Sequence, residues 1–321
     1  MKKILATLLT VALSMCLLCG CSSKSTTEIR VGSLKGPTTI GLLKLMDENS
    51  NGESKNTYTF EMASAADELL PKMISGDLDI ALVPANVAAV LYNKTEGGVV
   101  VLDINTLGVL YAVSGDDSVS SVADLKGRTI YLTGKGTTPD YVTQYLLSEN
   151  GLTTDDVNIE YLSEATEVAA NLKEHPENIG ILPQPFVTAA CIQNENLKVC
   201  LDLTEEWDKL NSSSGSRLVT GVTVCRREFL ENNEKAVKTF LEEHKASAEY
   251  VESDVEGAAA LTVAQGIIEK EPVAVKAIPN CNITYIDGDE LKSALSGYLS
   301  VLYDLDPTTV GGSLPSEDFY Y

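Results

Sequence analysis

The feature that most constrains this chain is a repeated alternation of short β-rich runs with longer helical runs. The runs EIRVGSL, TYTFEMA, LDIALVP and VNIEYLS are rich in Val, Ile and Tyr, and each precedes a segment with apolar residues at i, i+3 and i+4 spacing. Repeated alternation of this kind predicts an α/β fold with largely parallel sheets. Ligands of such sheets lie at the carboxyl ends of the strands, where loops lead into helices.

The loops at these expected carboxyl ends share a composition of small and polar residues. They read LKGPTT (34–39), ASAAD (63–67), VPANVA (83–88), NTLG (105–108), TGKGTT (133–138) and LPQPF (182–186). They contain neither His nor Cys, and Asp67 and two lysines are their only charged residues. Enzymes place an acid–base pair or an activated nucleophile at such positions. The composition therefore favours binding without chemistry and predicts no catalytic residue.

The stretch TGKGTTPDYV resembles part of a phosphate-binding loop but lacks its spacing. A P-loop has a Gly five residues before the Gly-Lys pair and Ser or Thr directly after it. Here those positions are Thr129 and Gly136. We therefore expect no nucleotide and no cofactor. A Gly/Thr turn between a strand at 128–133 and a helix at 139–150 still points backbone N–H groups at one spot, which attracts an anion or a polar ligand head.

The N-terminus predicts secretion and lipid anchoring. Lys2 and Lys3 precede an apolar run, Ile4–Leu18, that is too short to span a membrane comfortably. LCGC (18–21), followed by a polar stretch, resembles a bacterial lipobox. This resemblance implies a signal peptide over 1–20, lipidation of Cys21, a tether over 21–27 and a place on the extracytoplasmic face of the cell membrane. An ordinary cleaved signal with incidental cysteines is the alternative.

Charge and residue counts exclude several classes of function. The formal net charge of −22 disfavours nucleic acid and electrostatic docking on anionic lipid, so the lipid anchor is the only membrane contact that we expect. His175 and His244 are the only histidines, and we interpret both as solvated, which leaves no metal site.

Four cysteines remain beyond the expected signal and lipidation site. Cys191, Cys200, Cys225 and Cys281 have no CxxC spacing and allow three disulfide pairings, among which the sequence does not choose. We favour free thiols that pack as small hydrophobes.

Longer pieces of the chain are similar to substrate-binding lipoproteins of ABC importers, in the group that includes sulfonate, taurine, nitrate and thiamine-precursor binders. The matching pieces, in order along the chain, are KGPTTIGLLKLM, LLPKMISGDLDIALVPANVAAVLYN, SVADLKGRTIYLTGKGTTPDYVTQYLLSENGL and REFLENNEKAVKTFLEEHKASAEYV. The resemblance implies a two-lobed α/β fold of the periplasmic-binding-protein type 2 class, with two crossing segments. Lobe one would be 28–110 and 220–321, and lobe two 111–219, with crossings near 107–113 and 216–224.

The resemblance also implies a ligand site between the lobes. Its residues would be Gly36, Pro37, Thr38, Ser64, Pro84, Asn86, Thr133, Gly134, Lys135, Gly136, Thr137, Thr138, Pro183, Gln184 and Phe186. The loops offer Lys35 and Lys135 but no Arg, although arginine suits planar anions. A strongly anionic ligand is therefore disfavoured, and we expect a small polar organic ligand.

Several of these residues also have an ordinary structural interpretation. Lys135 is either a ligand contact or a solvated side chain, and Thr38 and Thr138 are either ligand contacts or helix N-caps. Phe186 and Trp207 are either core aromatics or stacking groups. The acidic run 202–210 predicts a solvated helix face.

The resemblance implies a monomeric binding protein that works with a permease and an ATPase. One alternative is an enzyme on the same fold, similar to menaquinone-pathway enzymes or a pyrimidine synthase. A sensor lipoprotein without transport is the other alternative.

Overall fold

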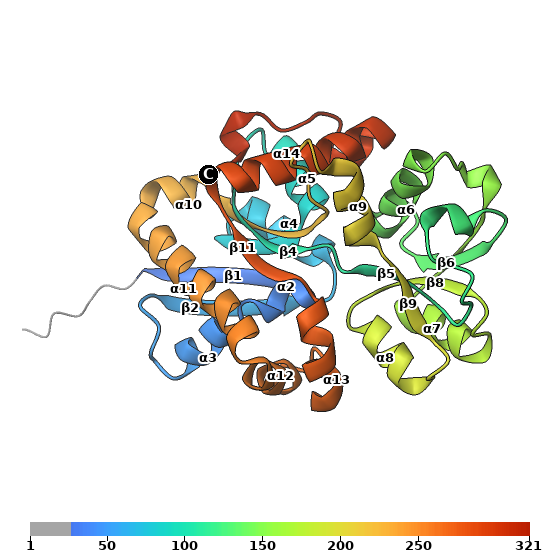
Figure 1. Cartoon of the computed structure of the whole chain (residues 1–321). Helices are drawn as coiled ribbons and strands as arrows, with labels where there is room; N and C mark the ends of the chain where they lie inside the picture. The colour runs from blue at the N-terminus through green and yellow to red at the C-terminus, as the bar shows by residue number, and fades with distance from the viewer. Residues whose placement is uncertain (1–26) are drawn as a thin grey trace, which may run out of the picture.

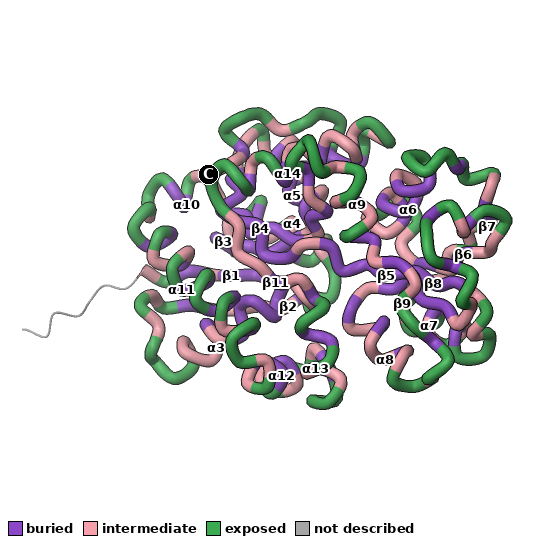
Figure 2. Tube along the Cα trace, in the orientation of Figure 1, coloured by how far each residue is buried: buried purple, intermediate pink, exposed green. Residues whose placement is uncertain are grey.

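The computed structural model describes residues 27–321, so the expected signal peptide and Cys21 lie outside the described residues. Within the described part, the chain forms two β-sheets side by side, each covered by helices (Figure 1). Figure 2 shows that the buried segments follow the strands of both sheets and the connection between them. The described residues contain no helix long and apolar enough to cross a membrane.

The first sheet is built from both ends of the chain. Its strands, in spatial order, are β11 (Ile283–Ile286), β4 (Val99–Leu107), β10 (Val219–Arg226), β3 (Ile80–Pro84), β1 (Glu28–Leu34) and β2 (Thr57–Ala63). β1 pairs in parallel with β2 and β3, whereas β10 is antiparallel to β3 and β4, and β11 is antiparallel to β4.

The second sheet is built from the middle of the chain. Its strands, in spatial order, are β7 (Asn158–Leu162), β6 (Thr129–Thr133), β8 (Ile179–Pro183), β5 (Leu110–Ser114) and β9 (Lys198–Asp202). β6 pairs in parallel with β7 and β8, and β5 is antiparallel to β8 and β9.

Both sheets are therefore mixed, and the expectation of largely parallel sheets is wrong. The reason lies in the crossings. β4 ends at Leu107 and β5 begins at Leu110 opposite Pro183, so the chain enters the second sheet at the edge where β8 ends. β10 begins opposite Leu107, so the returning chain runs against β3 and β4. A crossing strand enters each sheet at its carboxyl edge and must run in the reverse direction.

Helices cover both faces of each sheet. Those of the first sheet are α2 (Pro37–Ile40), α3 (Leu43–Ser50), α4 (Ala66–Ser75), α5 (Ala85–Lys94), α10 (Arg227–Asn232), α11 (Glu234–Ser253), α12 (Val255–Ala264), α13 (Glu271–Ala277) and α14 (Gly288–Leu305). Those that follow strands of the second sheet are α6 (Thr138–Glu149), α7 (Ala165–Glu174), α8 (Phe186–Gln193) and α9 (Leu203–Asn211). Short 3-10 helices are η1 (Val122–Leu125), η2 (Thr154–Asp156), η3 (Ile278–Asn280), η4 (Pro307–Val310) and η5 (Glu317–Phe319).

The two faces of the second sheet have separate cores. Val142 and Leu146 of α6 pack with Ile130 and Leu132 of β6 in one apolar cluster. α7 and α8 contribute to another cluster, which also contains Tyr111 and Val113 of β5. Since alternate residues of a strand point to opposite faces, α6 lies on one face of this sheet and α7 and α8 on the other.

His244 is buried, and the expectation of a solvated side chain is wrong. Its side chain has 0% exposure, stacks on Phe240 with ring centroids 5.4 Å apart, and places Nδ1 3.3 Å from Oδ2 of Asp103. Val237, Phe240, His244 and Val251 recur at helical spacing on one face of α11, and all are buried. Its charged neighbours Glu242 and Lys245 are exposed, whereas Glu243 is buried and accepts hydrogen bonds from Lys55 and Tyr58. His175, by contrast, is 57% exposed, as expected.

Trp207 is a core residue with 0% exposure. Its ring lies 4.5 Å from that of Tyr145 and 5.5 Å from that of Tyr298 on α14, so α9 packs against both lobes. The acidic run 202–210 therefore forms a helix with only one solvated face. Asp202 caps this helix by accepting hydrogen bonds from the N–H groups of Thr204 and Glu205.

The four cysteines within the described residues, Cys191, Cys200, Cys225 and Cys281, are free thiols. Cys225 and Cys281 have 0% exposure and pack in apolar clusters, as expected of small hydrophobes. Cys191 and Cys200 are partly exposed.

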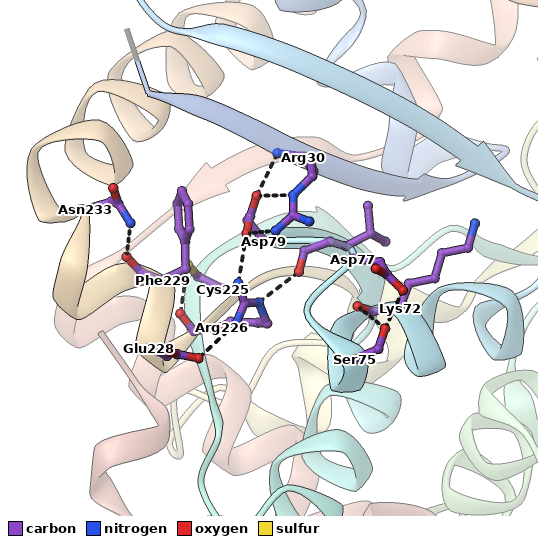
Figure 3. A network of polar contacts seen from close by, with 11 residues as sticks. Arg30, Lys72, Ser75, Asp77, Asp79, Cys225, Arg226, Glu228, Phe229 and Asn233 are labelled. Carbon is purple, nitrogen blue, oxygen red and sulfur yellow. Dashed lines mark hydrogen bonds and ion pairs between the residues drawn. The ribbon is translucent and has the colours of Figure 1, made fainter. Parts of the chain in front are cut away.

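One buried carboxylate joins three strands of the first sheet (Figure 3). Asp79, at the start of β3, is 1% exposed. It accepts hydrogen bonds from the backbone N–H, Nε and Nη2 of Arg30 on β1 and from Nη2 of Arg226 on β10. Burial alone would raise the pKa of Asp79, but the hydrogen bonds from Arg30 and Arg226 outweigh it and lower the pKa below its usual range.

Asp79→Asn should lower the free energy of unfolding by about 3 kcal/mol at pH 7, because it removes the charge that two arginines surround. The pKa of Asp79 is lower in the folded protein than the value of 3.8 in the unfolded chain. The carboxylate therefore contributes its full stabilisation above pH 3.8, and this stabilisation is lost as the pH falls through the pKa of the folded state. The difference in the free energy of unfolding between wild type and Asp79→Asn should therefore be smaller at pH 3 than at pH 7. Urea denaturation at both pH values measures it.

Asp77→Asn is the matched control, because Asp77 is exposed and its carboxylate accepts only from Ser75. We expect a change within about 0.5 kcal/mol. Equal losses of unfolding free energy in the two variants at pH 7 would contradict the stabilising role of the Asp79 carboxylate. A difference between wild type and Asp79→Asn that stays the same at pH 3 would also contradict it.

Candidate functional site

The predicted site residues follow the carboxyl ends of strands in both sheets. Gly36, Pro37 and Thr38 follow β1, Ser64 follows β2, and Pro84 and Asn86 lie where β3 enters α5. On the second sheet, 133–138 joins β6 to α6, and 183–186 joins β8 to α8. Each group lies where the fold places ligand loops.

The structure brings part of the first-sheet group together around Gly221. This glycine pairs with Pro84 on β3 and with Thr106 on β4. A Cβ at Gly221 would lie 2.5 Å from Oδ1 of Asn105 and 2.5 Å from Cγ2 of Thr38. The absence of a side chain at this position therefore lets Thr38 and Asn105 meet over the crossing strand.

Asn105 and Thr106 were missed as individual site residues, although their loop was recognised. Both are buried, and Thr106 Oγ1 donates to Asn105 Oδ1 at 2.9 Å. Asn105 Nδ2 donates to Oγ1 of Thr223 at 3.1 Å, and Thr223 donates to Asp103 at 2.8 Å. His244 completes this chain of contacts from the other side of Asp103. Only the pairing of β4 with β10 brings these residues together, and no local spacing in the sequence indicates it.

Thr38 is held from within its own loop. It is 7% exposed, and its Oγ1 donates to the carbonyl oxygen of Leu34 at 3.1 Å. It lies inside α2, whose N-cap is Gly36 with φ of 139°, a conformation that favours glycine. Thr38 is therefore not an N-cap, and the same holds for Thr138, because Thr137 precedes α6 at that position.

Some backbone N–H groups of the turn 133–138 already donate hydrogen bonds within the protein. Gly134 and Gly136 have φ of 74° and 73°, which suits glycine. The N–H of Gly136 donates to Oδ2 of Asp140 at 2.8 Å, and the N–H of Thr137 donates to the carbonyl of Gly134. Asp140 is 3% exposed. A carboxylate of the protein thus occupies one position that an anionic ligand would need.

Asp140 is itself held by two further donors. Tyr161 donates its hydroxyl proton at 2.8 Å, and Gln144 donates from Nε2 at 2.6 Å. Burial, followed by the hydrogen bond and charge of Asp140, raises the pKa of Tyr161 well above its usual range. The Nζ atom of Lys135 lies 5.1 Å from the centre of the Tyr161 ring, so the exposed lysine rests on an aromatic face.

Thr138 brings the turn close to α14 of the first lobe. The buried hydroxyl of Tyr298 faces Thr138 without reaching hydrogen-bond geometry. Burial raises the pKa of Tyr298 to about 12, and Thr138 moderates that rise.

Other predicted residues already have partners within the protein. Glu68 accepts hydrogen bonds from the backbone N–H groups of Ser64 and Ala65, and Ser64 is exposed. Asn86 Nδ2 donates to the carbonyl of Thr309 at 3.4 Å. Phe186 packs against the apolar cluster under the second sheet, and Pro183 pairs with Leu110.

Gln184 is buried at the carboxyl end of β8. It is 3% exposed, and its backbone N–H donates to the carbonyl of Val109 between β4 and β5. Its Oε1 accepts from Oγ1 of Thr188 at 2.8 Å. Gln184 therefore connects its loop to the first crossing.

The site contains no acid–base pair that faces a shared space. Among the described residues, no group of three or more His, Cys, Asp or Glu side chains could hold a metal ion. The only cations of the predicted loops are Lys35 and Lys135, and both are exposed. The arrangement can donate and accept hydrogen bonds, and its histidine–carboxylate pair, His244 with Asp103, is fully buried.

Comparisons with solved structures give the same architecture. An ABC transporter protein from Parabacteroides distasonis is 25% identical, with a TM-score of 0.76, and the alignment covers 92% of this chain and 99% of that one. The periplasmic aliphatic sulphonate binding protein of Escherichia coli is 17% identical, with a TM-score of 0.73 and coverage of 92% of each chain. A Candida albicans protein described as having the generic periplasmic binding protein fold is 14% identical, with a TM-score of 0.56 and coverage of 91% of this chain and 93% of that one.

No curated protein matches the sequence. A family model described as "ABC transporter, phosphonate, periplasmic substrate-binding protein" matches residues 51–241, which is more than half of the chain. The matched region includes both crossings, the turn 133–138 and all of the second sheet. This chain therefore belongs to the phosphonate family of periplasmic substrate-binding proteins of ABC transporters, and it is a binding protein rather than an enzyme.

Proposed function

We propose that this protein is anchored by a lipid at Cys21 on the extracytoplasmic face of the membrane, binds a small polar organic molecule between its lobes and delivers it to a permease. The lobes are 28–110 with 220–321, and 111–219. The membership of β4 and β10 in the first sheet and of β5 and β9 in the second supports these boundaries. The ATPase is a separate subunit, and the protein works as a monomer.

The observation that carries this proposal is the meeting of polar loops at the carboxyl edges of both sheets. Thr38, Pro84 and Asn105 gather around Gly221 on one side, and the turn 133–138 lies at the corresponding edge on the other. A cleft between two such edges presents hydrogen-bonding groups from both lobes to one ligand. Closing on that ligand would present a changed surface to the permease.

The charges near the turn bear on the class of ligand. The family and one relative are named for phosphonate and sulphonate, which are strong anions. In this chain the loops carry two exposed lysines, and the carboxylate of Asp140 lies at the start of α6. A negative group there opposes a second anion. We therefore favour a neutral or weakly anionic polar compound, with pyrimidine-like molecules ahead of nitrate or sulfate.

A ligand panel tests the binding function. A compound present at about 100 times its dissociation constant should stabilise the protein by about 2.7 kcal/mol and raise the melting temperature by several degrees. The panel contains sulfonates, phosphonates, pyrimidines, thiamine precursors and amino-acid derivatives. We expect no shift with ATP, GTP or NAD, and mass spectrometry should recover the ligand unchanged. A nucleotide hit, or a product, would overturn the proposal.

Gly136→Val then tests the turn with the compound that the panel identifies. The variant forces a branched side chain into φ of 73° and should weaken binding much more than it lowers stability. Gly127→Val is the matched control, because Gly127 has φ of 76°, has open space around its Cβ position and lies at the other end of β6. Calorimetry should find weaker binding only in Gly136→Val. Equal affinity in the two variants would remove the turn from the site.

The anchor is tested by Cys21→Ala. Loss of the thiol prevents lipidation, so the variant should appear in the medium or remain an unprocessed precursor, whereas wild type partitions into detergent. Cys16→Ala changes a cysteine within the apolar run and should leave processing and partitioning unchanged. A processed, membrane-bound Cys21→Ala protein would refute the lipid anchor.

A further inference from the structure

A hollow lies between the lobes, lined by α8, β5 and β9 of the second lobe and by α13 and η3 of the first. Its volume is about 910 Å³, which is in the range of small-molecule sites. Figure 1 shows α8 and α13 facing one another below the crossing, and the hollow lies between them. We call it the α8–α13 groove.

The groove is separate from the turn 133–138. Tyr111 and Val187 line it and belong to the apolar cluster under α7 and α8, whereas α6 packs on the opposite face of the second sheet. Of the residues predicted for the interlobe site, only Gln184 also lines the groove. A molecule in the groove would therefore not touch the turn.

Gln184 supplies a buried polar group with spare capacity. The backbone N–H of Thr188 donates to its side chain, which fixes the accepting atom as Oε1, and the Thr188 hydroxyl donates to the same oxygen. Among the described residues, no acceptor takes a hydrogen bond from Gln184 Nε2. The side chain is 3% exposed and lines the groove, so its free amide donor is available to a ligand there.

The two walls of the groove carry opposite charges. Lys276 comes from α13 of the first lobe, and Glu195, Asp202 and Glu205 come from the second lobe. Lys276, Glu195 and Glu205 are exposed, and none of the three forms an ion pair with another described residue. Tyr111 lines the same groove as Asp202 and Glu205, and burial, followed by the nearby charge of Asp202, raises the pKa of its hydroxyl above its usual range.

The geometry points to a binding site in the α8–α13 groove for a small zwitterion, a molecule with an ammonium group at one end and an acidic group at the other. The ammonium end pairs with Glu195 and Glu205, and the anionic end pairs with Lys276 and accepts a hydrogen bond from Gln184. Val187 and Ile192 supply apolar surface for the linking carbon atoms. A molecule with a single charge leaves one wall unpaired.

Two cysteines of the groove, Cys191 and Cys200, can report whether the groove is occupied. Both line it and are partly exposed, whereas Cys225 and Cys281 have 0% exposure. Burial raises the pKa of Cys191, and it raises that of Cys200 to about 11, so both thiols react slowly and a change in rate is easily followed. Alkylation with iodoacetamide, located by peptide mass spectrometry, measures access to the groove.

The test compares 4-aminobutyrate with butylamine and butyrate, which each carry one of its two charges. At a concentration about ten times its dissociation constant, 4-aminobutyrate should leave the groove unoccupied in only about a tenth of the protein molecules. Alkylation of Cys191 and Cys200 should therefore slow about tenfold. Butylamine and butyrate at the same concentration should protect much less. Equal protection by butylamine, or no protection by 4-aminobutyrate, would overturn the proposal.

Substitutions then locate the bound zwitterion. Lys276→Gln and Glu205→Gln should each raise the dissociation constant of 4-aminobutyrate about tenfold, since each removes a charge-assisted contact. Lys270→Gln makes the same charge change at an exposed residue before α13 that does not line the groove, and should behave as wild type. Equal effects of Lys270→Gln and Lys276→Gln would refute the site.

Gly136→Val separates this site from the interlobe cleft. Protection by 4-aminobutyrate should persist in that variant, whether or not the cleft ligand still binds. Loss of protection in Gly136→Val, with full protection in Lys276→Gln, would place the zwitterion in the cleft and overturn the groove site while leaving the proposed function intact.

Discussion

The antiparallel pairing of β4 with β10 is the constraint on which the rest of the structure depends. These two strands carry the chain out of the first lobe and back into it, and they lie side by side in the first sheet. Their pairing joins Asp103 to Thr223 and Thr223 to Asn105 by hydrogen bonds in a fully buried environment. Because buried polar groups are costly without partners, the observed pairing is stabilised by satisfying all three side chains. That pairing also places Gly221 beneath Thr38 and Asn105, so the packing of the crossing and the shape of the candidate site have one cause.

The sequence predicted those parts of the architecture that depend on residues close to one another along the chain. Strand–helix alternation indicated an α/β fold, the family resemblance implied two lobes, and the Gly-rich turn after β6 was expected before a helix with Pro139 near its start, as the structure has it. The prediction failed for the direction of the crossing strands and for His244, because both depend on contacts between distant segments. The periodic apolar positions of α11 could have placed His244 on the buried face, but its charged neighbours suggested a solvated helix. The partner that stabilises it, Asp103, lies 141 positions away.

The candidate site was predictable as a set of loops, and less so as a set of side chains. Strand ends and small polar residues identify the loops, since the fold places ligands there. Which atoms remain free depends on intramolecular competition that spacing does not reveal. Glu68 accepts a hydrogen bond from the N–H of Ser64, and Asp140 accepts one from the N–H of Gly136. The carbonyl oxygen of Thr309 accepts one from the side-chain amide of Asn86. By contrast, Gln184 Nε2 stays free because Thr188 holds the other end of its side chain.

Gln184 also connects the first crossing with the α8–α13 groove. Its backbone N–H is tied to Val109 at the first crossing, while its side chain lines the α8–α13 groove. The groove takes one wall from each lobe, and the hydroxyl of Tyr111 donates across it to the carbonyl of Asn280 at 2.9 Å. A molecule bound between these walls interacts differently with different arrangements of the lobes. If the proposed cleft ligand also favours one arrangement of the lobes, linkage requires each ligand to change the affinity for the other by the same factor.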